Sequence, residues 1–146
     1  MVGFYGRERV TYRDLLYETV LASGGKCACS LAVNTYGNTE NFVKEMNKTA
    51  KDLNLKKTHF KNPEGLYEKG QYSSTRDIGI LLKEAIKDEN FRSIFTTVTY
   101  ASSKTIDHPK GKFISSTVLL KLKNYDIDGF KIIGGKSGTT PKASLC

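Results

Sequence analysis

Residues 11–25 read TYRDLLYETVLASGG, and this stretch decides the fold class that we expect. Thr11 and Asp14 have the spacing of a capping box, in which a hydroxyl and an acid close the first turn of a helix. The residues that then recur with the period of one helical face are Tyr12, Leu15, Leu16, Thr19 and Val20. The Ser-Gly-Gly at residues 23–25 ends the helix, because two glycines lower helical propensity.

The pattern stays mainly helical outward from this stretch. We expect a short helix over residues 26–33, and another whose apolar stripe is formed by Phe42, Met46, Ala50 and Leu53. Ser74 and Asp77 form a second capping box ahead of the helical spacing of residues 78–86. Residues 95–100 are expected to be extended, and residues 130–133 are the one convincing strand. Since one strand cannot make a sheet, either weaker strands are hidden or part of the fold is missing.

Length, charge and cysteine content exclude several classes of protein. The 146 residues correspond to one domain at most, and no apolar run approaches the roughly 20 residues that span a bilayer. The N-terminus lacks the features of a signal peptide. The net charge of +8 suits an acidic partner, but the basic residues are dispersed, so we expect no specific nucleic-acid partner. Cys27, Cys29 and Cys146 form no disulfide framework or metal-ligand spacing, so we expect free thiols, no metal and no cofactor.

Residues 134–139, GGKSGT, hold the densest chemistry in the chain. They resemble a phosphate-binding loop, but Phe130 stands where that motif requires glycine. The alternative is a strand that carries Lys136 and Ser137 to an active site, with glycines that let a substrate backbone lie close against it.

Several ordered motifs together resemble the serine-type D-alanyl-D-alanine carboxypeptidases, the low-molecular-weight penicillin-binding proteins of peptidase family S11. The similarity runs from about residue 8 to the end of the sequence. The segments that carry it are VTYRDLL (10–16), SGG (23–25), THFKNPEGL (58–66), YSSTRD (72–77) and IGGKSGTT (133–140). The resemblance implies an α+β, β-lactamase/transpeptidase-like fold, of which this chain would hold mostly the helical subdomain and the strand with Lys-Ser-Gly.

The resemblance also implies site residues and partners. Ser23 would be catalytic, as the second-motif serine in the proton-shuttling network. Lys136 and Ser137 would bind the terminal carboxylate of the substrate, and Gly138 and Thr139 would pair with its backbone. The expected ligands are a peptidoglycan stem peptide that ends in D-Ala-D-Ala and β-lactams. Family members act outside the cytoplasmic membrane, on the cell-wall side, so the same location is implied here.

Two departures from the family pattern limit the activity that we expect. Gly25 stands where many members have Asn, and Lys26 stands where an alternative form of the motif has Asp. No Ser-x-x-Lys fits the family's position N-terminal to the second motif. We therefore expect residues 1–146 to be a partial catalytic domain that lacks the N-terminal Ser-x-x-Lys segment and the C-terminal strands, and that is inactive alone.

Two other functions remain open from the sequence. The chain could be a non-catalytic remnant that binds wall peptide or a partner protein, or a hydrolase similar to class A β-lactamases. A missing half of the sheet would leave an edge through which a homodimer could form.

Overall fold

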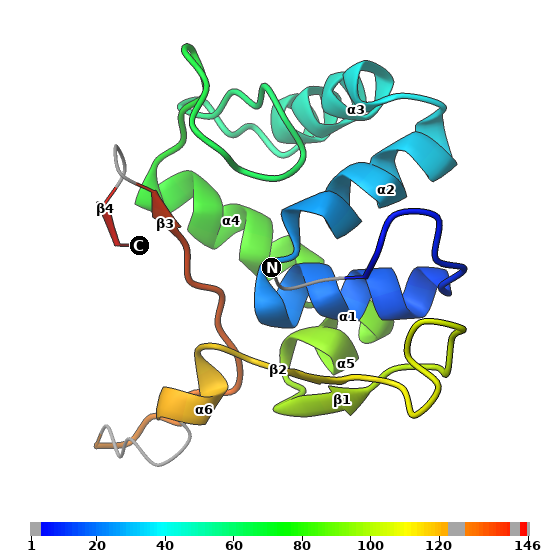
Figure 1. Cartoon of the computed structure of the whole chain (residues 1–146). Coiled ribbons are helices and arrows are strands. Elements are labelled where there is room, and N and C mark those ends of the chain that lie inside the picture. The colour runs from blue at the N-terminus through cyan, green and yellow to red at the C-terminus, as the bar shows by residue number, and fades with distance from the viewer. Residues whose placement is uncertain (1–3, 123–127, 141–143, 146) are drawn as a thin grey trace.

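The computed structural model describes residues 4–122, 128–140 and 144–145, and this part of the chain is mainly helical (Figure 1). The helices are α1 (Tyr12–Ala22), α2 (Gly25–Tyr36), α3 (Thr39–Asp52), α4 (Thr75–Ala85), α5 (Glu89–Phe95) and α6 (Leu119–Leu122). The strands are β1 (Thr99–Ala101), β2 (Phe113–Ser115), β3 (Thr139–Thr140) and β4 (Ser144–Leu145). No helix in the described residues is both long and apolar enough to cross a membrane.

The boundaries of α1 follow the predicted capping box and helix stop, and local caps also bound α2 and α3. The capping box of Thr11 and Asp14 is formed at the start of α1, and Ser23 ends that helix in a left-handed conformation. Gly37 ends α2 with a positive φ, and the side chain of Asn38 accepts a hydrogen bond from the Asn41 amide to begin α3. Local sequence signals therefore locate these three helices, although α2 continues to Tyr36, beyond the predicted end at residue 33.

α1 lies at the centre of the molecule, with α2 on one side and α5 and the β1–β2 hairpin on the other (Figure 1). The core cluster consists of Tyr17, Leu21, Ile94 and Ile114. The rings of Tyr17 and Tyr100 stack with centroids 3.7 Å apart and fasten β1 to α1. Burial of these apolar groups stabilises the packing of α1 against the hairpin.

The apolar spacing predicts the buried face of α1 only in part, since Leu15 is buried as expected. Tyr12 and Leu16 are 54% and 40% exposed, whereas Asp14 and Glu18 are almost completely buried. The Asp14 carboxylate accepts hydrogen bonds from the amide and hydroxyl of Thr11, the hydroxyl of Tyr100 and the amide of Ser103. Because the Tyr100 and Ser103 donors come from distant segments, the sequence period could not identify this polar contact as part of the interior.

Weak strands do form a small sheet, as one of the sequence alternatives proposed. β1 and β2 are antiparallel, with Tyr100 opposite Ile114. The extended conformation predicted for residues 95–100 begins only at Thr99, and residues 130–133 form no strand. Strand formation requires a hydrogen-bonded neighbour, which an apolar run does not itself supply.

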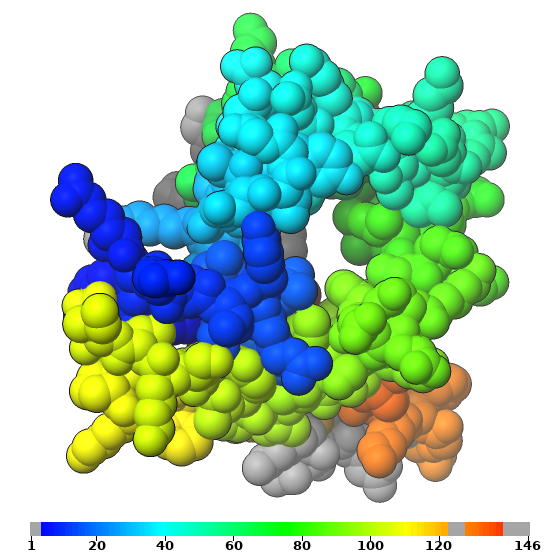
Figure 2. Space-filling view, turned by 90° about the vertical axis from the view of Figure 1, so that its right-hand side faces the viewer, coloured from blue at the N-terminus to red at the C-terminus, as the bar shows by residue number. Residues whose placement is uncertain are grey.

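The helix predicted over residues 78–86 is confirmed as α4, but its apolar stripe is largely uncovered. Ile78 and Leu82 are 46% and 36% exposed. Ser74 caps α4, while the carboxylate of Asp77 accepts hydrogen bonds from the Lys57 amide and the Thr58 hydroxyl, 2.7 and 2.8 Å away. Figure 2 shows the surface hollowed between the part built by α2 and α3 and the part built by α4.

Candidate functional site

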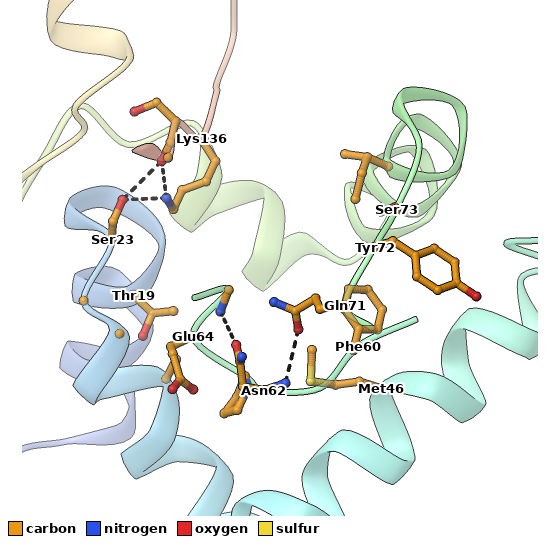
Figure 3. Close-up of a pocket in the computed structure, with 18 residues that line it drawn as sticks. Thr19, Ser23, Met46, Phe60, Asn62, Glu64, Gln71, Tyr72, Ser73 and Lys136 are labelled. Atoms are coloured by element: carbon orange, nitrogen blue, oxygen red, sulfur yellow. Dashed lines mark hydrogen bonds between the residues drawn. The ribbon is translucent and has the colours of Figure 1, made fainter. Parts of the chain in front are cut away.

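A pocket of about 600 Å³ lies where the end of α1, the loop at residues 58–66 and residues 136–138 meet (Figure 3). Thr19 and Ser23 line it from α1, and Met46 lines it from α3. Lys136, Ser137 and Gly138 form another part of its wall. Segments that are far apart in the sequence therefore share one concave surface, the usual setting of a ligand site.

The position of Ser23 follows from the way α1 ends. Ser23 has φ 61° and ψ 39°, and its amide donates to the carbonyl of Glu18. This left-handed turn exposes the Ser23 side chain at the pocket. A non-glycine residue in this region is strained, and such residues are concentrated at functional sites.

Lys136 contacts Ser23 directly. Its ammonium group donates to the Ser23 hydroxyl and to the Ser137 carbonyl, each at 2.5 Å. Ser23 Oγ in turn donates to the Ser137 carbonyl at 3.3 Å, and the hydroxyls of Ser137 and Thr117 lie 3.1 Å apart. Desolvation lowers the pKa of Lys136. Hydrogen bonds thus connect Ser23, Lys136 and Ser137, which are three of the five predicted site residues. Gly138 lies beside them in the pocket wall.

The last predicted site residue, Thr139, is described only through its backbone. It begins β3, where Thr139 pairs with Leu145 of β4. Its side chain and all of Cys146 lie outside the described residues. Residues 136–138 precede β3, so the Lys-Ser-Gly motif leads into a strand instead of lying within one.

Gly134 and Gly135 pack closely against neighbouring side chains. A Cβ at Gly134 would lie 2.4 Å from Cδ1 of Phe95, and one at Gly135 would lie 2.6 Å from Cγ1 of Val118. These glycines therefore allow the chain to pack against α5 and the start of α6, which places Lys136. A Cβ at Gly138 would meet no atom within 4 Å, so this glycine faces open space.

Amide side chains build the wall at residues 58–66. Asn47 of α3 holds Phe60 by accepting from its amide and donating to its carbonyl, each at 2.8 Å. Gln71 accepts from the amides of Lys61 and Asn62 and donates to the Leu66 carbonyl. Asn62 closes its own turn by accepting from the Gly65 amide at 2.8 Å. Asn47 and Gln71 from outside the motif, together with Asn62 within it, thus stabilise a loop that belongs to no helix or strand.

Glu64 lies beside Gly25, the position where the sequence departs from the family. A Cβ at Gly25 would come within 3.2 Å of Glu64 Cβ, so a larger residue would require this loop to shift. Cys29 donates to the Glu64 carboxylate at 3.1 Å, which contributes with burial to raising the pKa of Cys29 to about 11. Cys27 is free and buried, and Cys29 is free and half-buried.

Sequence reasoning missed two features near Ser23. The first is that Ser23 and Lys26 themselves have the Ser-x-x-Lys spacing. Lys26 provides the lysine of this pattern at the position where the family's second motif can have Asp. Glu18 also contacts this turn. The only sequence signal for such a contact was the presence of one charged residue among mostly apolar neighbours.

Comparison with known proteins places these features in a family. A family model described as D-alanyl-D-alanine carboxypeptidase, peptidase S11, matches residues 3–146. The D-alanyl-D-alanine carboxypeptidase DacF of Bacillus subtilis is 38% identical over 140 residues, which are 95% of this chain and 34% of that protein. The D-alanyl-D-alanine carboxypeptidase of Streptomyces sp. K15 is 31% identical, and the match covers 95% of this chain and 49% of that protein.

Solved structures match over a similar extent. The crystal structure of the Streptomyces K15 DD-transpeptidase superposes with a TM-score of 0.79 at 27% identity, covering 99% of this chain and 57% of that one. A D-alanyl-D-alanine carboxypeptidase structure from Mycobacterium tuberculosis gives 0.78 at 28% identity, covering 92% and 48%. The chain thus has a partial transpeptidase-like fold and spans between a third and somewhat over half of these relatives. It belongs to the D-alanyl-D-alanine carboxypeptidase family, peptidase family S11.

Proposed function

We propose that this chain is part of a serine D-alanyl-D-alanine carboxypeptidase domain and recognises the D-Ala-D-Ala end of a peptidoglycan stem peptide. The observation that carries the proposal is the contact of Lys136 with Ser23 at the edge of the pocket. A cation and several hydroxyls at an open concave surface suit a ligand that ends in a carboxylate. A β-lactam with a carboxylate suits the same surface.

Each site residue has a role in this proposal. Lys136 attracts the terminal carboxylate, and the Ser137 hydroxyl donates a hydrogen bond to it. The backbone at Gly138 and Thr139 pairs with the peptide, as in strand addition. Ser23 Oγ accepts from Lys136 Nζ and donates to a carbonyl, so it can relay a proton between the ligand and the lysine.

The nucleophile in this family is the serine of a Ser-x-x-Lys motif that precedes the second motif. Residues 1–22 contain no serine, so the sequence supplies no Ser-x-x-Lys N-terminal to Ser23. We propose that residues 1–146 are a partial catalytic domain and do not hydrolyse peptide alone. Acyl-enzyme formation would then require a nucleophile that these residues do not provide.

Binding of a short peptide that ends in D-Ala-D-Ala tests the recognition step. We expect saturable binding by isothermal titration calorimetry, and no comparable binding of the matched L-Ala-L-Ala peptide. Lys136→Met should weaken binding about tenfold, which corresponds to about 1.4 kcal/mol. Lys83→Met removes an exposed lysine of α4 outside the pocket and serves as the control. Equal binding of the two peptides would contradict the proposal.

Incubation with penicillin followed by intact-mass spectrometry tests the assignment of the nucleophile. We expect no covalent adduct on the folded chain. An adduct mapped to Ser23 would identify Ser23 as a nucleophile and would overturn the proposal that the chain is inactive alone. An adduct on another serine would overturn the same proposal and name that residue instead.

Two other functions give different results in these assays. Gly25 and Lys26 favour a non-catalytic remnant. Such a remnant would bind the peptide but would not hydrolyse it, even when a full Ser-x-x-Lys segment is supplied. A hydrolase similar to class A β-lactamases would hydrolyse a chromogenic cephalosporin. The loop at residues 58–66 favours the carboxypeptidase, because it carries the run most typical of that family.

We also propose a location and an assembly state. The family resemblance favours a site of action outside the cytoplasmic membrane. The β1–β2 hairpin has an outward-facing Phe113 that is 82% exposed, which favours association of two copies through this edge. Sedimentation velocity of the chain and of Phe113→Lys tests this, and a monomer at all concentrations would contradict it.

A further inference from the structure

Glu18 is a buried acid that the proposed chemistry does not use. Its side chain is 1% exposed, and its Oε1 atom is buried without a hydrogen-bond partner among the described residues. Burial raises the pKa of Glu18, and the charge of Lys112 partly offsets this effect. An unpaired buried acceptor lowers stability, so its position calls for a physical explanation.

The explanation lies in the turn that carries Ser23. The carbonyl of Glu18 accepts the amides of both Ser23 and Gly24, the latter at 3.0 Å. The side chain reaches the same turn, because a Cβ at Gly24 would lie only 2.8 Å from Glu18 Cγ. Glu18 thus contacts the turn through its backbone and through its side chain.

Other segments hold Glu18 against this turn. Lys112, from the loop between β1 and β2, has its ammonium group 3.9 Å from Glu18 Oε2 and 4.8 Å from the ring of Phe4. Cys27 of α2 is another titratable group near Glu18, and Asp14 lies one turn earlier on α1 but is engaged by its own donors. Lys112 therefore restrains the carboxylate while the aliphatic part of Glu18 packs against Gly24.

We propose that Glu18 is a positioning residue for Ser23: its buried side chain packs against Gly24 and sets the turn that directs the Ser23 hydroxyl to Lys136. The inference rests on the proposed function, because it concerns the residue that would relay a proton there. Gly24 has φ −69° and ψ 84°, a backbone conformation with negative φ that alanine can adopt. Glycine at this position is therefore required mainly by the close approach of Glu18.

Paired substitutions isolate this contact. Gly24→Ala should displace the turn in the unaltered chain and also in Glu18→Gln, which keeps Cγ. In Glu18→Ala the clashing Cγ is absent, and the added Cβ would meet only the Glu18 carbonyl oxygen at 3.2 Å and Cys27 Sγ at 3.4 Å, so adding Gly24→Ala should have a much smaller effect. Gly79→Ala is the matched control, since Gly79 lies on α4 with nothing within 4 Å of its Cβ position.

The readouts are the NMR signals of the Ser23 amide and the Lys136 ε-carbon, together with the Kd for a D-Ala-D-Ala peptide. We expect Gly24→Ala to shift both signals and to raise the Kd about tenfold, in the unaltered chain and in Glu18→Gln. In the Glu18→Ala background, which should itself bind about tenfold more weakly, the added change should be less than twofold. A purely structural role would change the free energy of unfolding and leave the Lys136 signal and the Kd of the folded variants unaltered.

Several outcomes would overturn the inference. One is an equal effect of Gly24→Ala in the Glu18→Ala background, and another is a folded Glu18→Ala whose Ser23 and Lys136 signals are unchanged. If Glu18→Ala does not fold, Gly24→Ala alone decides, because unchanged signals in that variant exclude the proposed contact. If the unaltered chain binds no D-Ala-D-Ala peptide, the proposed function fails, while the NMR signals still decide the role of Glu18.

Discussion

The ammonium group of Lys136 lies 2.5 Å from the hydroxyl of Ser23, although the two residues are 113 positions apart in the sequence. The contact depends on a left-handed turn after α1 and on a glycine-rich segment that packs against α5. Each support can be removed separately, so the structure makes specific predictions about which substitutions disturb the site and which disturb only the fold.

Binding of a D-Ala-D-Ala peptide should depend on the charge of Lys136. Because desolvation lowers the pKa of Lys136, its ammonium group should lose its proton below the pH at which an ordinary lysine titrates. The peptide carboxylate then loses its positively charged partner, so binding should weaken over the same pH range. NMR titration of the ε-carbon of Lys136 measures this pKa directly. A Lys136 pKa that is not below the usual value for lysine would contradict the desolvation, and binding that persists after Lys136 deprotonates would contradict its role.

Gly134→Ala should damage the site through packing. The added methyl group would lie 2.4 Å from the Phe95 ring and 2.7 Å from the Phe95 carbonyl, so the segment that carries Lys136 must move. Overpacking of this kind costs about 1–3 kcal/mol. Urea denaturation should show this loss, and the Kd for peptide should rise. Gly79→Ala, on the exposed side of α4, should instead stabilise the chain by about 0.5–1 kcal/mol.

Asp14→Ala should lower the free energy of unfolding by about 3 kcal/mol, because it leaves buried donors without their acceptor. Burial alone would raise the pKa of Asp14, but hydrogen bonds from Thr11, Ser103 and Tyr100 outweigh it and lower the pKa. The unaltered chain should therefore lose this contribution as the pH falls from the unfolded-state pKa through the lower folded-state value. Denaturation between pH 7 and pH 3 should show a weaker acid dependence in Asp14→Asn, with exposed Glu40→Gln as the control.

Glu18 should affect the pH dependence in the opposite direction. Its pKa is raised by burial, so its contribution to stability is complete below the unfolded-state value and is lost as the pH rises through the folded-state value. The difference in unfolding free energy between the unaltered chain and Glu18→Gln should therefore decrease as the pH rises across this interval. A difference that is constant with pH would show that Glu18 titrates normally.

Asn47→Ala should loosen the loop at residues 58–66. Asn47 satisfies both backbone groups of Phe60, so its loss should cost about 1–3 kcal/mol and speed amide exchange at Phe60. Asn90→Ala, on α5, is the matched control. Protection of the Phe60 amide that is unchanged by Asn47→Ala would show that the loop is held by other contacts.

The sequence by itself determined the features that depend on neighbours along the chain. The hydroxyl of Thr11 and the acid of Asp14 closed the first turn of α1 as expected, and Ser23 ended it, because capping and helix termination involve residues within one turn. The apolar period located α4 for the same reason. The ordered motifs also identified the family, since their spacing does not depend on how the segments pack.

Only the tertiary structure decided which groups meet. It buried Asp14 and Glu18 where the period indicated Tyr12 and Leu16, because their hydrogen-bonding and charged partners come from the distant segment around the β1–β2 hairpin. It also packed Gly134 against Phe95, a contact that the sequence did not predict. Such contacts join residues that are distant in sequence, so their geometry is set by the packing of whole helices and strands. The local sequence pattern therefore cannot predict them.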